Sequence, residues 1–317
     1  MIANKMSIFG FEGDKEKVIQ GINSSTFTEL LAADAESVGF VPVLGQHGSN
    51  ALTSEANKHL VLFKLRIDTK KVPPSAVNNE VKKRAAEIEE REGYRPGRKQ
   101  MREIKEQVQD EMILKALAQT VVIDGWFDFN NMLLVITESS GSKCDRVHGA
   151  LLKAVDGLKP RFLRSANNPS NIMTLWISGA DEPPETITVD DKAKFAFPEG
   201  GKASLSALNL TDERIAQLTS MGGKVVELGV TIKDRWSVVV TETLVIKKIT
   251  HVDLDSEFGE ASEEAWMAEA TINADTAQKV HDALIDAFGG YMPRSQEDEE
   301  SADVSDEASM ESSRQAA

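Results

Sequence analysis

The chain has 317 residues, of which 41% are hydrophobic, enough for a sizeable core in one large or two modest domains. No run approaches the roughly 18 consecutive apolar residues that a membrane helix needs, and the first residues lack the apolar region of a secretory signal. The single cysteine, Cys144, excludes an internal disulfide. We therefore expect a cytoplasmic protein without a membrane partner.

The net charge of −15 argues at first against a nucleic-acid partner, but the charge is unevenly distributed. Residues 64–115 hold 14 basic and 10 acidic side chains, a net charge of +4. Residues 293–317 hold eight acidic and two basic side chains and almost no apolar ones. This last segment cannot bury enough surface to fold, so we predict a disordered acidic tail.

The first 75 residues combine helical and strand patterns. Residues 15–33 have helical spacing in parts, and the apolar run 60–66 predicts a largely buried strand. Pro73 and Pro74 then break the chain. We assign residues 1–75 to an N-terminal α+β part of the body.

A pair of helices is predicted for residues 76–119. Apolar side chains recur at three- and four-residue spacing in 76–92 and again in 98–119, and the glycine-containing segment 93–97 turns the chain between them. Both helices are charged around most of their circumference. Such a pair either projects into solvent or faces a polar partner.

Period-two patterns dominate the C-terminal α+β part of the body, residues 120–292. Asn130-Asn131 predicts the turn of a hairpin, and the strands beyond it form an antiparallel meander with turns at 233–234 and 242–243. The fold class is α+β with largely antiparallel sheets. The predicted strands are 121–129, 132–137, 225–231, 236–241 and 244–249, and the predicted helices are 142–155 and 275–288.

Catalytic and metal-binding motifs are absent from the sequence. The five histidines are scattered, no Cys-His cluster has zinc-ligand spacing, and Gly45 and Gly48 belong to neither a P-loop nor a dinucleotide fingerprint. Cys144 begins a predicted helix and is interpreted as a packing residue rather than a nucleophile. We expect no catalytic residue, no metal and no cofactor.

One short pattern resembles part of a nuclease site. Glu103 and Lys105 have the spacing of a nuclease fragment, with Asp110 nearby. Inside a helix, however, side chains two residues apart face different ways. We interpret these residues as a solvated helix face.

Residues 91–105 are the most basic stretch, with six basic and two acidic side chains. On charge alone, this pattern is typical of a salt-bridged, solubilising helix surface. The alternative is a phosphate-contacting surface, on which lysine and arginine release counterions from a duplex.

A collinear series of short segments favours the second interpretation. In order and spacing, the series resembles the recombination-associated protein RdgC family, over nearly the whole chain to about Gly290. The segments are Gly39-Phe40-Val41-Pro42, Ala51-Leu52-Thr53, Lys71-Val72-Pro73-Pro74-Ser75-Ala76-Val77, Arg91-Glu92-Gly93, Gly97-Arg98-Lys99, Arg102-Glu103-Ile104-Lys105-Glu106-Gln107-Val108, Leu210-Thr211-Asp212-Glu213-Arg214-Ile215, Gly223-Lys224-Val225-Val226, Arg235 and Ile246-Lys247-Lys248-Ile249.

The resemblance implies a ring-shaped homodimer that encircles double-stranded DNA without marked sequence preference. It also implies association with the nucleoid and restraint of RecA-promoted recombination. A ring needs basic side chains only on its inner wall, so an acidic exterior is compatible with DNA binding. Carried over by position, the DNA-binding candidates are Arg66, Arg95, Arg98, Lys99, Arg102, Lys105, Lys115, Lys224, Arg235, Lys247 and Lys248.

Two departures from the family pattern concern DNA contact or ring closure. The run Leu114-Lys115-Ala116-Leu117 stands where the family usually has Pro-Arg-Ala-Phe. Residues 206–209, Ser-Ala-Leu-Asn, replace a basic cluster. Two other functions stay open: a metal-dependent exonuclease, and a protein-interaction module whose acidic surface and tail bind a basic partner.

Overall fold

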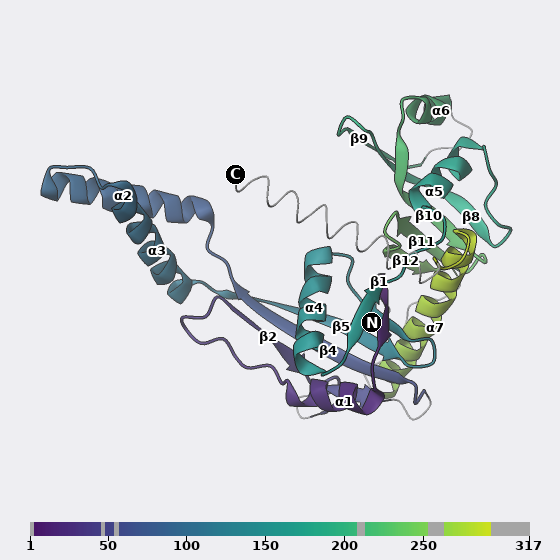
Figure 1. Ribbon diagram of the computed structural model, residues 1–317, viewed down its shortest axis with the longest axis horizontal. Helices are drawn as coiled ribbons and strands as arrows, with labels where there is room; N and C mark the ends of the chain where they lie inside the picture. Colours follow the sequence, from purple (N-terminus) through teal and green to yellow (C-terminus); the bar gives the residue numbers. More distant parts are fainter. Residues whose placement is uncertain (1–2, 46–47, 54–56, 208–212, 253–262, 293–317) are drawn as a thin grey trace.

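The computed structural model describes residues 3–45, 48–53, 57–207, 213–252 and 263–292, and these residues form an α+β fold with seven helices and one 12-stranded sheet. The predicted fold class is confirmed. Figure 1 shows a curved molecule with α2 and α3 at one end and β8, β9 and α6 at the other. The helices are α1 Lys15–Ser24, α2 Pro74–Glu92, α3 Arg98–Lys115, α4 Gly141–Ala154, α5 Pro169–Ser178, α6 Glu213–Ser220 and α7 Glu263–Ala287.

The named strands all pair antiparallel, in the order β2-β4-β5-β6-β1-β12-β11-β10-β8-β9, while β3 pairs with β4 and β7 with β1. The first half of the sheet meets the second where β1 pairs with β12, and two register pairs join them: Lys5 with Lys247, and Met6 with Ile246. The strands are β1 Lys5–Glu12, β2 Glu36–Val41, β3 Ala51–Thr53, β4 Leu60–Lys70, β5 Ala118–Asp128, β6 Leu133–Ile136, β7 Lys159–Phe162, β8 Ile187–Ala196, β9 Lys202–Leu205, β10 Lys224–Ile232, β11 Trp236–Thr241 and β12 Ile246–His251.

Two hydrophobic clusters lie on opposite faces of the sheet. Along β1, Met6 and Ile8 belong to a cluster that includes residues of α5 and α7, whereas Phe9 and Phe11 belong to one that includes residues of α1 and α4. This alternation follows from the two-residue period of a strand. We call the side that carries α1 and α4 the α4 face.

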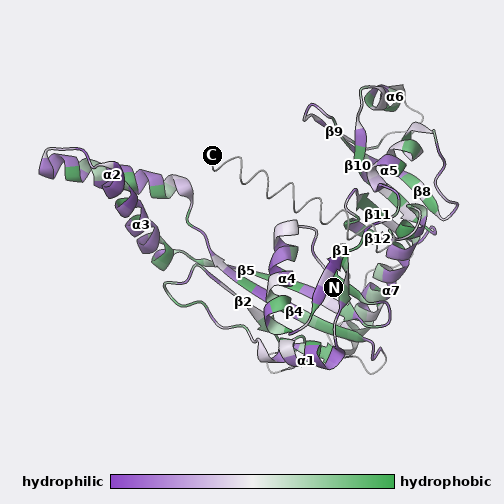
Figure 2. Cartoon of the chain, in the orientation of Figure 1, coloured by the Kyte–Doolittle hydropathy of each residue, from purple (hydrophilic) through white to green (hydrophobic). Residues whose placement is uncertain are grey.

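The helices α2 and α3 pack on each other through a small cluster of their own, formed by Val77, Val81, Ile104 and Val108. Figure 2 shows that most residues of these two helices are hydrophilic, and Figure 1 shows that the helices extend away from the sheet. The prediction that the second helix reaches residue 119 is wrong, because Ala118 already pairs with Lys70 at the end of β4.

Other predicted elements are present with shifted ends. The hairpin at Asn130-Asn131 is confirmed: the Asp128 carboxylate accepts hydrogen bonds from both backbone amides of that turn. The meander is formed by β10, β11 and β12. In the first 33 residues the helix covers only 15–24, and the last helix begins at residue 263, well before 275.

The predicted tail, 293–317, lies outside the described residues. The division into residues 1–75, 76–119 and 120–292 stays a prediction. Within the described part of the chain, no helix has the length and apolar character required to cross a membrane.

Candidate nucleic-acid interface

Two consecutive lysines of β12 emerge on the same side of the sheet. Ile246 and Ile249 flank Lys247 and Lys248. Both isoleucines belong to the hydrophobic cluster that includes residues of α7, on the side of the sheet opposite the α4 face. The register between β11 and β12 shifts here, and Lys248 has a φ of +52°. This bulge inserts one extra residue, so both ammonium groups lie opposite the core instead of alternating.

Glu227 of β10 forms ion pairs with two neighbouring lysines. The Nζ atoms of Lys247 and Lys194 lie 3.1 and 3.3 Å from its Oε1 atom. Burial tends to raise the pKa of this carboxyl group, but the hydrogen bonds and charges of the two lysines outweigh burial and lower it. Lys192 and Lys248 line a cavity of about 250 Å³ beside this group.

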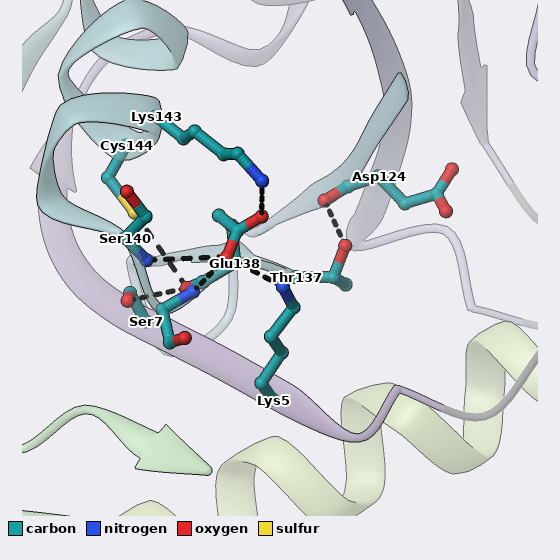
Figure 3. Close-up of polar contacts among 9 residues, drawn as sticks. Lys5, Ser7, Asp124, Thr137, Glu138, Ser140, Lys143 and Cys144 are labelled. Carbon is teal, nitrogen blue, oxygen red and sulfur yellow. Dashed lines mark hydrogen bonds and ion pairs between the residues drawn. The ribbon is translucent and has the colours of Figure 1, made fainter. Parts of the chain in front are cut away.

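Glu138 forms a second cluster, which like the first consists of one glutamate and two lysines (Figure 3). Lys5 of β1 and Lys143 of α4 each place Nζ 2.7 Å from one of its carboxylate oxygens, and the backbone amides of Ser139 and Ser140 donate to Oε1. Burial alone would raise the pKa of Glu138, but the hydrogen bonds from Lys143, Lys5 and Ser139 lower it to about 2. Glu138 therefore stays ionised and fixes both lysines.

A third group of cations surrounds a cavity of about 260 Å³ at the start of α4. Lys71, Lys143 and Arg146 line it together with hydroxyl and amide side chains, and no carboxylate contributes to the lining. Arg146 also forms an ion pair with Glu36, at 2.6 Å. A cavity with this lining suits a phosphate group.

The three groups are continuous. Lys143 belongs to both the cavity and the Glu138 cluster, and Lys5 stands directly opposite Lys247, so their side chains share one face. We call this set the cation row. From β1 to β8 it crosses four strand spacings, roughly 19 Å, which exceeds the roughly 12 Å width of a DNA major groove. Its members are Lys5, Lys71, Lys143, Arg146, Lys192, Lys194, Lys247 and Lys248.

Of the eleven residues predicted from the sequence, Lys247 and Lys248 belong to the cation row. Six others lie on the helix pair or its connection, where all are exposed, and Arg102 forms an ion pair with Glu106 at 2.9 Å. Figure 1 places the connection between α2 and α3 at the far end of the molecule, whereas Lys115 ends α3 near the sheet. The six are Arg95, Arg98, Lys99, Arg102, Lys105 and Lys115.

The remaining three predicted residues lie away from the cation row. Arg66 is on the opposite face of β4, since Leu65 and Ile67 pack on the α4 side, and its guanidinium group pairs with Asp68 at 2.6 Å. Lys224 donates to Asn171 of α5, which packs in the opposite core. Arg235 lies in the β10–β11 turn over the ring of Trp236, 5.0 Å from its centroid. Within the protomer the eleven predicted residues therefore do not share one face of the sheet, and their contact with DNA stays a prediction.

Sequence reasoning missed six members of the cation row. Four of the six are isolated basic residues in three elements that lie far apart in the sequence: Lys5, Lys143, Lys192 and Lys194. The periodicity of a strand or helix does not show which of its faces lies on the same side of the sheet as the basic residues of another element. Lys71 was quoted above only as part of a family segment, and Arg146 only as part of a predicted helix. The pairing of β1 with β12 brings them together.

The residues considered for catalysis occupy ordinary structural positions. Glu103 and Lys105 are exposed on either side of buried Ile104, which confirms the solvated helix face. Cys144 is buried, its thiol donates to the Glu138 carbonyl oxygen, and burial raises its pKa. Among the described residues, no group of three or more His, Cys, Asp or Glu side chains could hold a metal ion. His47 lies outside these residues.

Comparison with known proteins assigns the chain to a family. A family model described as "Putative exonuclease, RdgC" matches residues 3–291. The chain belongs to the RdgC family. The cation row lies entirely within the matched residues, and the acidic segment 293–317 lies outside them.

Relatives in the RdgC family cover most of the chain. The "Recombination-associated protein RdgC" of Bordetella pertussis is 32% identical over 247 residues, which cover 76% of this chain and 82% of the relative. That of Cupriavidus pinatubonensis is 34% identical, with 73% and 79% covered. That of Janthinobacterium sp. is 31% identical, with 88% and 93% covered.

Proposed function

We propose that this member of the RdgC family holds double-stranded DNA on its cation row, without sequence preference and without a chemical reaction. The observation that carries the proposal is the alignment of eight cations across the joint between the two halves of the sheet. Three carboxylates pair with some of them: Glu36, Glu138 and Glu227. Contacts of ammonium and guanidinium groups with phosphates give affinity but little sequence information.

The protein acts as a homodimer in this proposal. The two ends of the curved protomer meet the same ends of a second copy, and the resulting ring encloses the duplex. Exposed apolar side chains near the base of the helix pair support self-association: Leu114, Leu117 and Val122 are 53%, 90% and 51% exposed. The dimer doubles every phosphate contact made by one protomer.

We further propose that the DNA-bound dimer is associated with the nucleoid and restrains RecA-promoted strand exchange. A duplex enclosed by the protein is not accessible as a partner for a recombination filament. The name of the relatives, which links them to recombination, supports this role.

Duplex binding at a series of salt concentrations tests the proposal. Fluorescence anisotropy with two unrelated duplexes of equal length should give similar affinities. The logarithm of the affinity should fall with the logarithm of the salt concentration, by about 0.9 for each phosphate neutralised. Light scattering of the free protein and of the complex gives the number of protomers. Binding that is insensitive to salt, or absent at low salt, would refute a phosphate-contacting surface.

Encirclement has its own test. A ring can slide off the ends of a linear duplex but stays on a closed circle of the same length. We expect a high-salt wash to release the protein faster from linear than from circular DNA, and equal release would argue for an open clamp. Loss of end-labelled DNA in the presence of Mg²⁺, abolished by Glu103→Ala, would instead support the exonuclease that the family description names.

A further inference from the structure

The described chain ends beside the cation row. The backbone amide of Met292 donates to the Arg164 carbonyl oxygen at 2.9 Å, and Tyr291 forms a β-bridge with Ser165. Met292 also lines a cavity of about 520 Å³ together with Phe162 and Leu244. These contacts fix the point from which residues 293–317 continue.

Two of the residues that line this cavity with Met292 belong to segments that lead to the cation row. Phe162 of β7 is 69% exposed and lies edge-on to Phe9, whose side chain faces the α4 side of the sheet. Leu244 precedes β12, in which Lys247 and Lys248 follow within four residues. The last described residue therefore lies against β7 and against the turn before β12, three residues along the chain from Lys247.

Length and charge match this surface. At up to about 3.3 Å per residue, 25 residues can extend about 80 Å, far more than the width of the cation row. The segment has eight carboxylates and two basic side chains. On the cation row, Lys71, Lys192 and Lys248 form no ion pair within the described part of the chain.

We propose that residues 293–317 dock on the cation row when DNA is absent and compete with duplex DNA for it. This inference rests on the proposed function for the competition, but not for the docking. Attachment to the same chain gives the segment an effective concentration of about a millimolar, so weak individual contacts suffice. The basic side chains at the connection between α2 and α3 offer the acidic segment an alternative docking site, but this connection lies at the far end of the molecule (Figure 1).

Docking is tested on the full chain without DNA. A carbodiimide joins a carboxylate to a lysine only when the two are in contact, and mass spectrometry identifies the linked residues. We expect links from the eight acids of 293–317 to Lys192, Lys247 and Lys248. These links should not form when the reaction is carried out in 1 M NaCl. Links mainly to Lys99 and Lys105 of α3, to Lys279 of α7, or to no lysine would overturn the proposal.

Competition is tested with two full-length variants. In one, the eight acids of 293–317 are replaced by Asn or Gln; in the other, the segment is scrambled with its composition kept. The neutralised variant should bind duplex DNA about tenfold more tightly near 0.1 M NaCl, and the scrambled one should match the parent protein. Equal affinity of all three would overturn the competition.

The two proposals fail separately. If no variant binds DNA at low salt while the cross-links to the cation row are present, the docking stands and the DNA-binding function is wrong. If DNA binding is present and salt-dependent but the cross-links are absent, the proposed function stands and the docking is wrong.

Discussion

Lys5 and Lys247 stand directly opposite one another where β1 pairs with β12, and each is held by a different glutamate. Two like charges at opposed positions of an antiparallel pair are destabilising. Glu138 and Glu227 offset this repulsion at the joint between the two halves of the sheet. The same repulsion makes the site attractive to a phosphate.

Replacing Glu138 by Gln should therefore lower stability and raise DNA affinity together. Loss of a buried carboxylate that holds two lysines is expected to cost about 3 kcal/mol at pH 7. Because the folded-state pKa of Glu138, about 2, lies below its ordinary value of 4.5, this stabilisation is complete above pH 4.5 and disappears as the pH falls towards 2.

Thermal unfolding of the parent protein and of Glu138→Gln at pH 7 and pH 3 checks this prediction. The difference in unfolding temperature should be largest at pH 7 and should shrink at pH 3. A difference that does not change with pH would contradict the assigned ionisation. Lys5→Gln serves as a control that removes one of the two ion pairs and keeps the carboxylate.

The double substitution Lys247→Gln and Lys248→Gln should weaken binding to all duplexes alike. If both ammonium groups contact phosphates, the slope of log affinity against log salt should decrease in size by about 1.8 for each protomer, which is about 3.6 for the proposed dimer. Lys279→Gln is the matched control, because Lys279 lies on α7 and pairs with Asp275. An unchanged slope in the double variant would remove these lysines from the interface.

If the proposed dimer forms through the exposed apolar side chains near the base of the helix pair, replacement of Leu117 by Glu should shift the protein from dimer to monomer. The side chain is 90% exposed in the protomer, so a charge there costs little in the isolated chain but is costly in an apolar contact between copies. Light scattering over a range of concentrations measures the shift, and circular dichroism confirms that the fold persists. Leu152→Glu, at a 51% exposed position of α4, is the control.

His281 should make the fold sensitive to mild acid. Its side chain is 2% exposed, Nε2 lies 3.0 Å from the Tyr291 hydroxyl, and burial lowers its pKa to about 4. Since the ordinary value is 6.5, the neutral folded form loses stability as the pH falls from 6.5 towards 4, by up to about 3 kcal/mol. His281→Gln should flatten the unfolding temperature over this interval, and a parallel profile would contradict the prediction.

Local patterns predicted the elements whose contacts are local. The α2–α3 pair follows from three- and four-residue spacing, and the β10–β11 turn follows from Lys233-Asp234, which adopts positive φ at both residues. The face of Arg66 was not predictable in this way. Residues 60–63 of β4 are all buried, so the run of apolar residues does not reveal which side carries α4.

The cation row depended on information that no local pattern contains. The bulge at Lys248 is a property of the register between β11 and β12, since an unbroken strand would send Lys247 and Lys248 to opposite sides. Lys5 and Lys247 meet only through long-range pairing. The family resemblance supplied a function and a list of basic residues, and the sheet topology decides which of them lie together.

The joint at β1 also determines when this surface can form during synthesis. Asn4 accepts a hydrogen bond from the amide of Ile249, and the amide of Ala3 donates to Asn273, 270 residues further along the chain. A nascent polypeptide emerging from the ribosome can pair β1 with β6 long before β12 has been translated. Contacts of such high sequence separation form late, so an incomplete chain can be compact and still lack the complete cation row.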